Sequence, residues 1–291
     1  MSTRARGRSG ASADVRVLIS ADMEGIAGVV AYDDVLPGRP DYERNRSLMT
    51  AEVSAGVRGA LAYDPGAEVL VADAHADGRN LLPAELDRRA RLIRGEPRPG
   101  GMLAGIAAGV DAVVLIGQHA QAGTADAVLA HSVNGRAILE VRCNGQALGE
   151  VGLNVAYAAA HGTTVVLATG DDAATAEAEQ FAPGVRTVAV KRALGGWAAE
   201  CLHPEEARRL IETATTEALA ARADIRPARF DGPVELEIDL IRPVFVEPLL
   251  LIPGMLRNGG RGLRYRAESF EQAYEIVLLV AMVSPPLAEQ P

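Results

Sequence analysis

Five short apolar runs recur along the first two thirds of the chain and predict buried β-strands. Each run is rich in Val, Ile, Leu or Ala, and polar residues or glycine flank it. This pattern is typical of parallel strands that are covered on both faces. The runs are Val15–Ile19, Glu68–Ala72, Ala112–Ile116, Thr163–Ala168 and Thr187–Val190.

Segments with helical periodicity lie between these runs. Tyr42–Ala62 places Val53 and Val57 on one face at the spacing of an α-helix. Gly101–Ala108 and Gly149–Ala160 predict two further helices. Because strands alternate with helices, we expect an α/β fold, with a three-layer domain built around a mostly parallel sheet.

The pattern changes after about residue 200 and predicts a smaller α+β C-terminal lobe over residues 201–291. Pro204 opens an amphipathic helix there, since proline is favoured in the first helical turn. After it we expect a strand at Val234–Ile238, a loop rich in Pro and Gly over residues 242–262, a strand at Leu263–Ala267 and a helix at Phe270–Met282. The α/β domain would then span residues 14–200.

The first 13 residues differ from the rest in composition. They carry Arg4, Arg6 and Arg8 among Gly, Ser and Ala and contain no apolar stretch of the kind found in a secretory signal peptide. We therefore expect residues 1–13 to form a disordered tail.

Charge and cysteine content narrow the range of partners and compartments. With 29 basic and 38 acidic residues, the net charge is −9, which argues against binding to nucleic acid or to an anionic membrane surface. No apolar run approaches the ~18–20 residues that span a bilayer. A disulfide between Cys143 and Cys201 stays open, but so few cysteines favour a reducing compartment. We expect a cytoplasmic location.

Candidate metal ligands follow three of the predicted strands. Asp22 and Glu24 come after the first strand, His75 after the second and His119 after the third. The carboxyl ends of strands in an open α/β sheet form its binding crevice, so these four side chains should meet at one edge. Two carboxylates and two imidazoles suit zinc or a similar divalent ion.

Each of these residues also has a simpler interpretation. Asp22 alone could cap a turn or helix, Glu24 could be a solvated charge, and either histidine could be structural. Asp73 is interpreted as a cap or as a support for the neighbouring ligands. The coincidence of four candidates at equivalent strand ends, in a chain with five histidines, favours a metal site.

Other chemistries find little support in the sequence. It contains no GxxxxGK[ST] phosphate loop, no GxSxG nucleophile turn and no HExxH helix. Cys143 lies in a probable strand, Ile138–Cys143, without an activating neighbour that the sequence identifies. His161 and His203 lie next to predicted helix ends and are interpreted as structural.

Several short motifs follow one another along about residues 14–283. They are Asp22-Met23-Glu24-Gly25-Ile26, Asp73-Ala74-His75, Gly117-Gln118-His119-Ala120, His131-Ser132, Gly149-Glu150-Val151-Gly152-Leu153-Asn154 and Gly170-Asp171-Asp172. In this order they resemble the motifs of the D-aminopeptidases associated with dipeptide-transport operons.

The resemblance implies a zinc aminopeptidase that releases D-amino acids such as D-Ala from the N-terminus of short peptides. It implies two zinc ions per subunit, bound by Asp22, Glu24, His75, His119 and Glu150, with Asp22 as the shared ligand. It also implies that His131 is the catalytic histidine and that the subunits assemble into homodecamers of two stacked rings.

The chain departs from the family pattern at Gly195-Gly196-Trp197, in the segment Leu194–Ala199, where the family usually carries an arginine. The departure concerns substrate preference and subunit contacts rather than the implied metal ligands. Two other functions stay open. One is a metal-dependent amidohydrolase acting on a non-peptide amide, and the other is a non-catalytic peptide-binding protein linked to peptide uptake.

Overall fold

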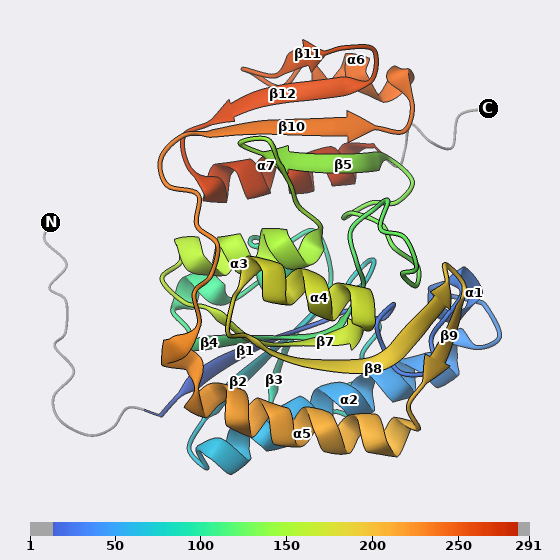
Figure 1. The fold of residues 1–291 in the computed structure, drawn as a ribbon, viewed down its shortest axis with the longest axis vertical. Coiled ribbons are helices and arrows are strands. Elements are labelled where there is room, and N and C mark those ends of the chain that lie inside the picture. Colours follow the sequence, from blue (N-terminus) through green and yellow to red (C-terminus); the bar gives the residue numbers. More distant parts are fainter. Residues whose placement is uncertain (1–13, 285–291) are drawn as a thin grey trace, which may run out of the picture.

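A large sheet at the base of the molecule positions most of the predicted site residues (Figure 1). The structure is a computed structural model that describes residues 14–284. All strands of the large sheet are parallel except the last, β9, which pairs antiparallel with β8. The order across the sheet is β3 (Arg91–Ile93), β2 (Glu68–Asp73), β1 (Arg16–Ala21), β4 (Ala112–Gln118), β7 (Val165–Asp171), β8 (Arg186–Gly195) and β9 (Ala198–Cys201).

Helices cover both faces of this sheet, which explains why its central strands are buried and mostly apolar. The helices α2 (Tyr42–Tyr63) and α5 (Pro204–Ala220) pack together on one face, and α3 (Glu150–Ala160) and α4 (Asp172–Phe181) cover the other. Every residue of β4 and β7 is buried as a result. The predicted three-layer α/β arrangement and the predicted strands are confirmed.

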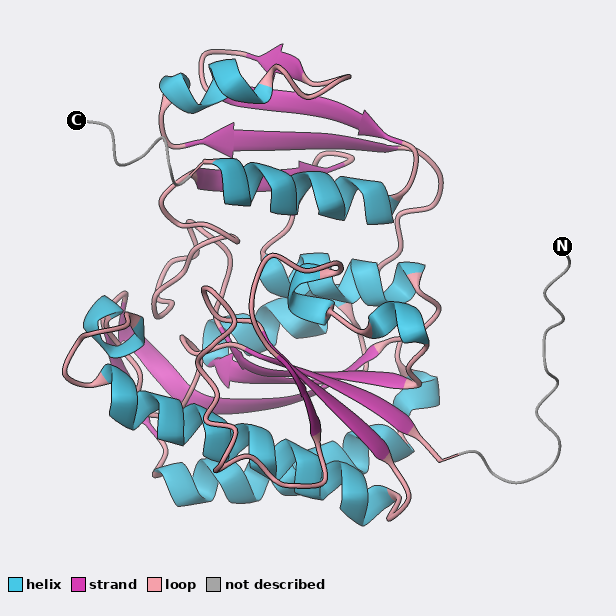
Figure 2. Cartoon of the chain, turned by 180° about the vertical axis from the view of Figure 1, so that it is seen from behind, coloured by secondary structure: helices cyan, strands magenta, loops and turns pink. Residues whose placement is uncertain are grey.

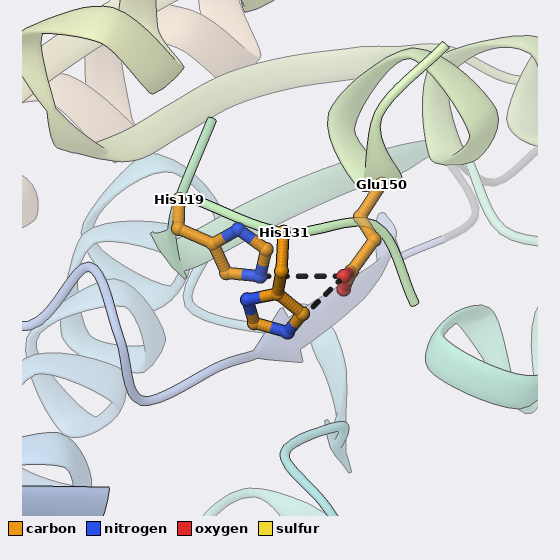
Figure 3. Close-up of side chains that lie close together, drawn as sticks. All are labelled: His119, His131 and Glu150. Atoms are coloured by element: carbon orange, nitrogen blue, oxygen red, sulfur yellow. Dashed lines mark ion pairs between the residues drawn. The ribbon is translucent and has the colours of Figure 1, made fainter. Parts of the chain in front are cut away.

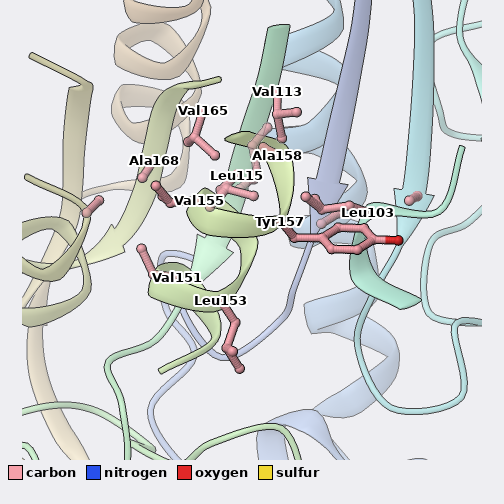
Figure 4. Packing of buried hydrophobic residues seen from close by; sticks show 14 of the residues in the cluster. Leu103, Val113, Leu115, Val151, Leu153, Val155, Tyr157, Ala158, Val165 and Ala168 are labelled. Atoms are coloured by element: carbon pink, nitrogen blue, oxygen red, sulfur yellow. The ribbon is translucent and has the colours of Figure 1, made fainter. Parts of the chain in front are cut away.

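Helix α3 contributes a large share of the core above the sheet (Figure 4). Its Val151 and Val155 side chains are fully buried, as are Leu115 of β4 and Val165 of β7. Burial of one such side chain stabilises the fold by roughly 1.5–3 kcal/mol. Helix α3 is therefore a firm support for Glu150, its first residue.

A second, antiparallel sheet lies on the far side of the α3 and α4 layer. Helix α7 (Phe270–Val283) lies between this sheet and α3, as both views of the chain show (Figure 1, Figure 2). Alternating buried and half-buried residues along β10 match a sheet with one covered face. The strand order is β11 (Leu256–Asn258), β12 (Gly262–Ala267), β10 (Val234–Leu240), β5 (Ile138–Cys143) and β6 (Gln146–Ala147).

The strands of this small sheet come from both sides of residue 200, since β5 and β6 precede it. Conversely, α5 follows residue 200 but packs on α2 beneath the large sheet. The strands are thus not divided between the two sheets at the predicted boundary. The division into units 14–200 and 201–291 stays a prediction.

Two local predictions were wrong. Gly101–Ala108 forms two separate 3₁₀ turns, η1 (Gly101–Leu103) and η2 (Ile106–Ala108), instead of a helix. Gly105 between them has a φ of 96°, which a right-handed helix does not contain. The predicted loop over residues 242–262 contains three short elements: η4 (Pro243–Phe245), α6 (Val246–Leu249) and β11. Two other short elements are α1 (Tyr32–Val35) and η3 (Arg222–Asp224).

Three further expectations concern the N-terminal tail, the two cysteines and membrane-spanning helices. The predicted tail over residues 1–13 lies outside the described residues. Cys143 and Cys201 are both free thiols, so no disulfide joins them. Within residues 14–284, no helix combines the length and the apolar character needed to cross a membrane.

Candidate active site

The loops after β1, β2 and β4 meet at the carboxyl edge of the large sheet. The β1 loop is attached to β4 by two backbone hydrogen bonds, from Asp22 N to Ile116 O and from Gly25 N to Gly117 O, both 2.8 Å long. A Cβ at Gly25 would lie 2.0 Å from Gln118 O, so only glycine allows this approach. The edge therefore brings together the side chains that follow the three strands.

Asp22, Glu24, His75 and His119 lie in direct contact at this edge. His75 Nδ1 is 3.2 Å from Asp22 Oδ1 and 3.0 Å from Glu24 Oε2. His119 Nε2 is 3.6 Å from the other oxygen of Asp22, Oδ2. The two oxygens of the Asp22 carboxylate thus face two different histidines.

The imidazole rings of His75 and His119 are oriented by backbone carbonyls. His75 Nε2 donates a hydrogen bond of 3.0 Å to Val35 O of α1, and His119 Nδ1 donates one of 3.0 Å to Ala120 O. The opposite nitrogen of each ring points to the carboxylates. Metal-binding histidines are held in this way, because the outer hydrogen bond fixes the tautomer and the ring orientation.

Glu150 and His131 extend the cluster (Figure 3). Glu150 Oε1 lies 3.3 Å from His119 Nε2 and 3.7 Å from His131 Nε2, and it accepts a hydrogen bond of 2.6 Å from Val133 N. The His131 ring stacks on the His119 ring, with centroids 3.9 Å apart. Glu150 comes from α3 and His131 from the loop after β4, so two further elements converge on the strand ends.

The loop that carries His131 has an unusual backbone. Leu129 and Val133, on either side of His131, have φ angles of 53° and 59°, which branched or bulky side chains rarely adopt. Leu129 N donates to Gly196 O over 3.0 Å, and Leu129 O accepts from His131 Nδ1 over 2.8 Å. The β8–β9 turn therefore supports the residue that orients His131. Such backbone strain is typical of functional loops.

Lys191 is the only lysine in the chain, and it supports the β1 loop from strand β8. Its Nζ donates hydrogen bonds to the carbonyl oxygens of Glu24, Ile26 (3.1 Å) and Val29 (2.6 Å). The three N–H groups of an ammonium match three converging carbonyls. Burial lowers the pKa of Lys191 to about 8. This lysine fixes the segment from which the Glu24 side chain projects.

The crowding of buried carboxylates shifts the proton affinities of the cluster. Burial and the neighbouring Glu24 carboxylate raise the pKa of Asp22 to about 7. Burial lowers the pKa of His75, but the Glu24 and Asp22 carboxylates outweigh it and hold that pKa well above its usual value. Burial is likewise outweighed at His119, where Glu150 and Asp22 raise the pKa. The carboxylates thus attract positive charge strongly.

The chemistry of these donors fits a divalent metal of zinc's type. Among residues 14–284, the carboxylates of Asp22, Glu24 and Glu150 form no ion pair with lysine or arginine. Glu24 Oε2 and His119 Nε2 are buried and make no hydrogen bond. Because buried carboxylates need a positive partner, a cation held by oxygen and nitrogen donors would satisfy both observations.

The donor atoms are also close enough to share ions. The ligand atoms of Asp22, Glu24 and His119 lie within 4.8 Å of one another, and so do those of His119, His131 and Glu150. All the predicted ligands are therefore brought together. Their role as zinc ligands, and the catalytic role of His131, stay predictions.

Three other residues have the structural roles that the sequence indicated. Asp73 accepts hydrogen bonds from the backbone N–H groups of Asn80 and Leu81, each 2.7 Å long, and so orders the segment after His75. His161 Nδ1 contacts Tyr157 O over 2.9 Å. His203 caps α5 by accepting from Glu205 N.

A cavity of about 750 Å³ opens onto the cluster, and Asp22, Glu24, His75, His131 and Glu150 are among the residues that line it. This volume lies within the ~300–1,000 Å³ that is usual for small-molecule sites. The departure from the family pattern lies near its rim. Trp197 is 71% exposed and contacts Tyr32, a lining residue, edge to face.

Comparison with known proteins decides the family. The model of peptidase family M55, described as D-aminopeptidase, matches residues 15–279. The chain belongs to the D-aminopeptidase family. The D-aminopeptidase of Bacillus subtilis (strain 168) is 33% identical over 271 residues, covering 91% of this chain and 96% of that protein.

A solved structure extends the similarity within the D-aminopeptidase family to three dimensions. The Zn-dependent D-aminopeptidase DppA from Bacillus subtilis, described as a self-compartmentalizing protease, has a TM-score of 0.89 and 30% identity to this chain. The match covers 95% of this chain and 99% of that chain. The predicted family and α/β fold are thereby confirmed, and the chain is a peptidase, hence a hydrolase.

Some residues of the site had not been identified from the sequence. Lys191 was not among the candidates from the sequence, although a single lysine among 29 basic residues was a signal in itself. Glu52 of α2, which accepts a hydrogen bond of 2.9 Å from Ala27 N in the β1 loop, gave no signal. Both act on the loop through contacts between residues far apart in the sequence.

Proposed function

We propose that this protein is a zinc-dependent aminopeptidase that releases N-terminal D-amino acids, such as D-Ala, from short peptides. One observation carries the proposal: in a member of the D-aminopeptidase family, buried carboxylates and imidazoles converge at the wall of a cavity, and within residues 14–284 no lysine or arginine pairs with these carboxylates. The similarity to a Zn-dependent D-aminopeptidase supports zinc as the metal.

We further propose two zinc ions per subunit, with Asp22 as the shared ligand. Asp22 Oδ1 faces His75, and Asp22 Oδ2 faces His119. This supports one ion bound by Asp22, Glu24 and His75, and a second bound by Asp22, His119 and Glu150. Zinc in such a site lowers the pKa of a water molecule towards ~7 and polarises a carbonyl group.

In this proposal His131 moves the proton. Its Nδ1–H donates to Leu129 O, so Nε2 keeps a lone pair. Burial and the neighbouring His119 lower the pKa of His131, which favours the neutral ring that can accept a proton. We expect Nε2 to take up a proton from the water that adds to the peptide carbonyl, and to pass it to the amine nitrogen as the C–N bond breaks.

A free N-terminus would also find partners at such a site. The amino group of a peptide can bind a zinc ion or donate a hydrogen bond to one of the carboxylates around it. A blocked N-terminus or an internal peptide bond offers no such group. The D-preference itself rests on family membership and on the named relatives.

The proposal is tested by metal analysis together with rates on paired substrates. We expect two zinc ions per subunit, loss of activity on chelation, and faster hydrolysis of D-Ala p-nitroanilide than of its L-Ala counterpart. Fewer than two ions would contradict the two-metal arrangement, and equal rates would contradict the D-preference. Simple amides cleaved faster than D-Ala dipeptides would favour the amidohydrolase, and binding without turnover would favour the peptide-binding protein.

We also propose that the protein is a homo-oligomer, and specifically a decamer. The description of the Bacillus subtilis structure as self-compartmentalizing supports an assembly that encloses its active sites. Sedimentation analysis would distinguish a decamer from smaller assemblies. A cytoplasmic location stays a prediction, as do the absence of nucleic-acid and membrane partners.

A further inference from the structure

Two arginines line the cavity, and they differ in what they already bind. Arg98 donates hydrogen bonds to the carbonyl oxygens of Gly95, Asp73 and Gly101, and it pairs with Glu96 at 3.2 Å. Its charge is therefore engaged by the protein itself.

Arg136 has no such partners. Its side chain is exposed and, among residues 14–284, forms neither a hydrogen bond nor an ion pair, although it lines the cavity. Its backbone N–H donates to Asn134 Oδ1 over 3.0 Å, which fixes the end of the loop that carries His131. The cavity thus combines a cluster of carboxylates with one arginine whose guanidinium is available to an anion.

The wall contributed by α7 is apolar. Leu278, Ala281 and Met282 line the cavity. A Cβ on Gly101 would lie 2.7 Å from Leu278 Cδ1, which shows how closely Leu278 packs on η1. Asn134 Nδ2 donates to Ala281 O over 2.9 Å, so the wall is attached to the same loop as Arg136.

Helix α7 is also fixed to the large-sheet side of the molecule. The Tyr274 ring stacks on Tyr157 of α3 with centroids 4.1 Å apart, and Tyr274 OH donates to Asn154 Oδ1 over 3.0 Å. Both tyrosines are buried. These contacts attach the apolar wall to helix α3, which begins at Glu150.

These features match one class of substrate. Resting on the proposed aminopeptidase function, we propose that Arg136 binds the C-terminal carboxylate of a dipeptide, while Leu278 and Met282 contact an apolar side chain on its second residue. With its free amino group held at the proposed metal site, such a dipeptide would direct its carboxylate toward Arg136, which lines the same cavity. The cavity volume of about 750 Å³ suits such a small ligand.

The test compares four substrates on each protein: D-Ala-Leu and D-Ala-Gly, each as the free acid and as the C-terminal amide. For Arg136→Gln we expect the acid-to-amide ratio of kcat/KM to fall about 10-fold, mainly through KM, because a charge-assisted hydrogen bond is lost. Arg136→Lys should keep most of the ratio. Arg88→Gln, at an exposed arginine outside the cavity, should not change it.

The apolar wall is tested with the Leu-to-Gly ratio of the free acids. Leu278→Ala and Met282→Ala should each lower that ratio about 10-fold, since lost apolar contact weakens discrimination by this order. Leu279→Ala is the matched control, because Leu279 lies on the same helix but outside the cavity lining.

Each ratio compares substrates on one preparation, so partial misfolding of a variant does not affect it. An unchanged acid-to-amide ratio in Arg136→Gln would overturn the carboxylate assignment. Unchanged Leu-to-Gly ratios in Leu278→Ala and Met282→Ala would overturn the assignment of these two residues to the side chain of the second residue. If the zinc-loaded parent protein cleaves none of the four substrates, the proposed aminopeptidase function fails. That result is distinct from an unchanged ratio in a variant, which overturns only the role of the substituted residue.

Discussion

The cavity is bounded by two regions of opposite character. At the sheet edge, Asp22, Glu24, His75, His119 and Glu150 are buried and crowd charged groups within hydrogen-bonding distance. Across the cavity, α7 presents apolar side chains, and Met282 is 51% exposed. Groups that must keep a fixed geometry lie on strand ends and a helix start, whereas groups that contact a variable part of a substrate lie on an added layer.

The two regions are also held in different ways. Backbone hydrogen bonds to β4 and the Lys191 ammonium fix the edge loop, so its position follows from the central sheet. Side-chain contacts of Tyr274 and Asn134 fix α7. Substitutions at the edge should therefore abolish turnover, and substitutions on α7 should change selectivity.

Removing one charge from the edge should have the largest effect. In Asp22→Asn we expect kcat/KM to fall at least ~10³-fold, because loss of metal-based stabilisation by several kcal/mol costs a factor of ten per 1.36 kcal/mol. Elemental analysis should find fewer than two zinc ions per subunit. Asp231→Asn, at an exposed aspartate, is the control. A fully active Asp22→Asn protein would break the distinction between the edge and the wall.

Replacing the proposed proton carrier should separate chemistry from metal binding. For His131→Gln we expect kcat to fall about 10²–10⁴-fold, the usual contribution of general acid–base catalysis, with zinc content retained. His161→Gln serves as the control, since His161 contacts Tyr157 of α3 and is not among the residues that line the cavity. Full turnover in the metal-loaded His131→Gln protein would remove His131 from the mechanism.

The only lysine should influence the edge indirectly. Lys191→Met removes the donor that ties together the carbonyls of Glu24, Ile26 and Val29, so we expect zinc affinity to fall about 10–100-fold, as for other groups that orient ligands. Titration with a competing chelator measures this affinity. If Lys191→Met lowers the melting temperature but leaves zinc affinity unchanged, Lys191 stabilises the fold without positioning Glu24.

Glu52 makes the support of the edge loop dependent on pH. Burial raises the pKa of Glu52 to about 7, so the folded protein favours the protonated carboxyl. Stability is then lost as pH rises from about 4.5, the usual value, to about 7. The loss at pH 8 is on the order of 3 kcal/mol, which Glu52→Gln should abolish. Denaturant unfolding at pH 5 and pH 8 measures it, and equal pH dependence of both proteins would contradict it.

The exposed rim should matter least. Trp197 contacts Tyr32 through its ring, but the turn supports Leu129 through the backbone oxygen of Gly196. Trp197 is exposed and is not among the residues that line the cavity, so Trp197→Ala should alter stability by only about 0.5 kcal/mol and change kcat/KM of D-Ala dipeptides by no more than about 3-fold. A loss beyond 10-fold would show that the indole takes part in substrate binding.

The sequence predicted five of the seven strands of the large sheet and four of the five proposed ligands. Short apolar runs that alternate with helical segments are typical of covered parallel strands, and the carboxyl ends of such strands meet at one edge. Asp22, Glu24, His75 and His119 follow directly from this rule. Glu150 and His131 were found only through the resemblance, because Glu150 begins a helix and His131 lies well along the loop after β4 rather than directly at the strand end.

Only the tertiary structure decided the remainder. Strand β5 pairs with β10, and α7 packs against α3, through contacts between residues about 100 or more positions apart. The cavity that α7 and Glu150 of α3 help to line depends on these contacts. Hydrophobic periodicity describes one segment at a time and does not indicate which distant segments pair with one another. The support of Glu24 by Lys191 likewise arises from packing, since 167 residues separate the two in sequence.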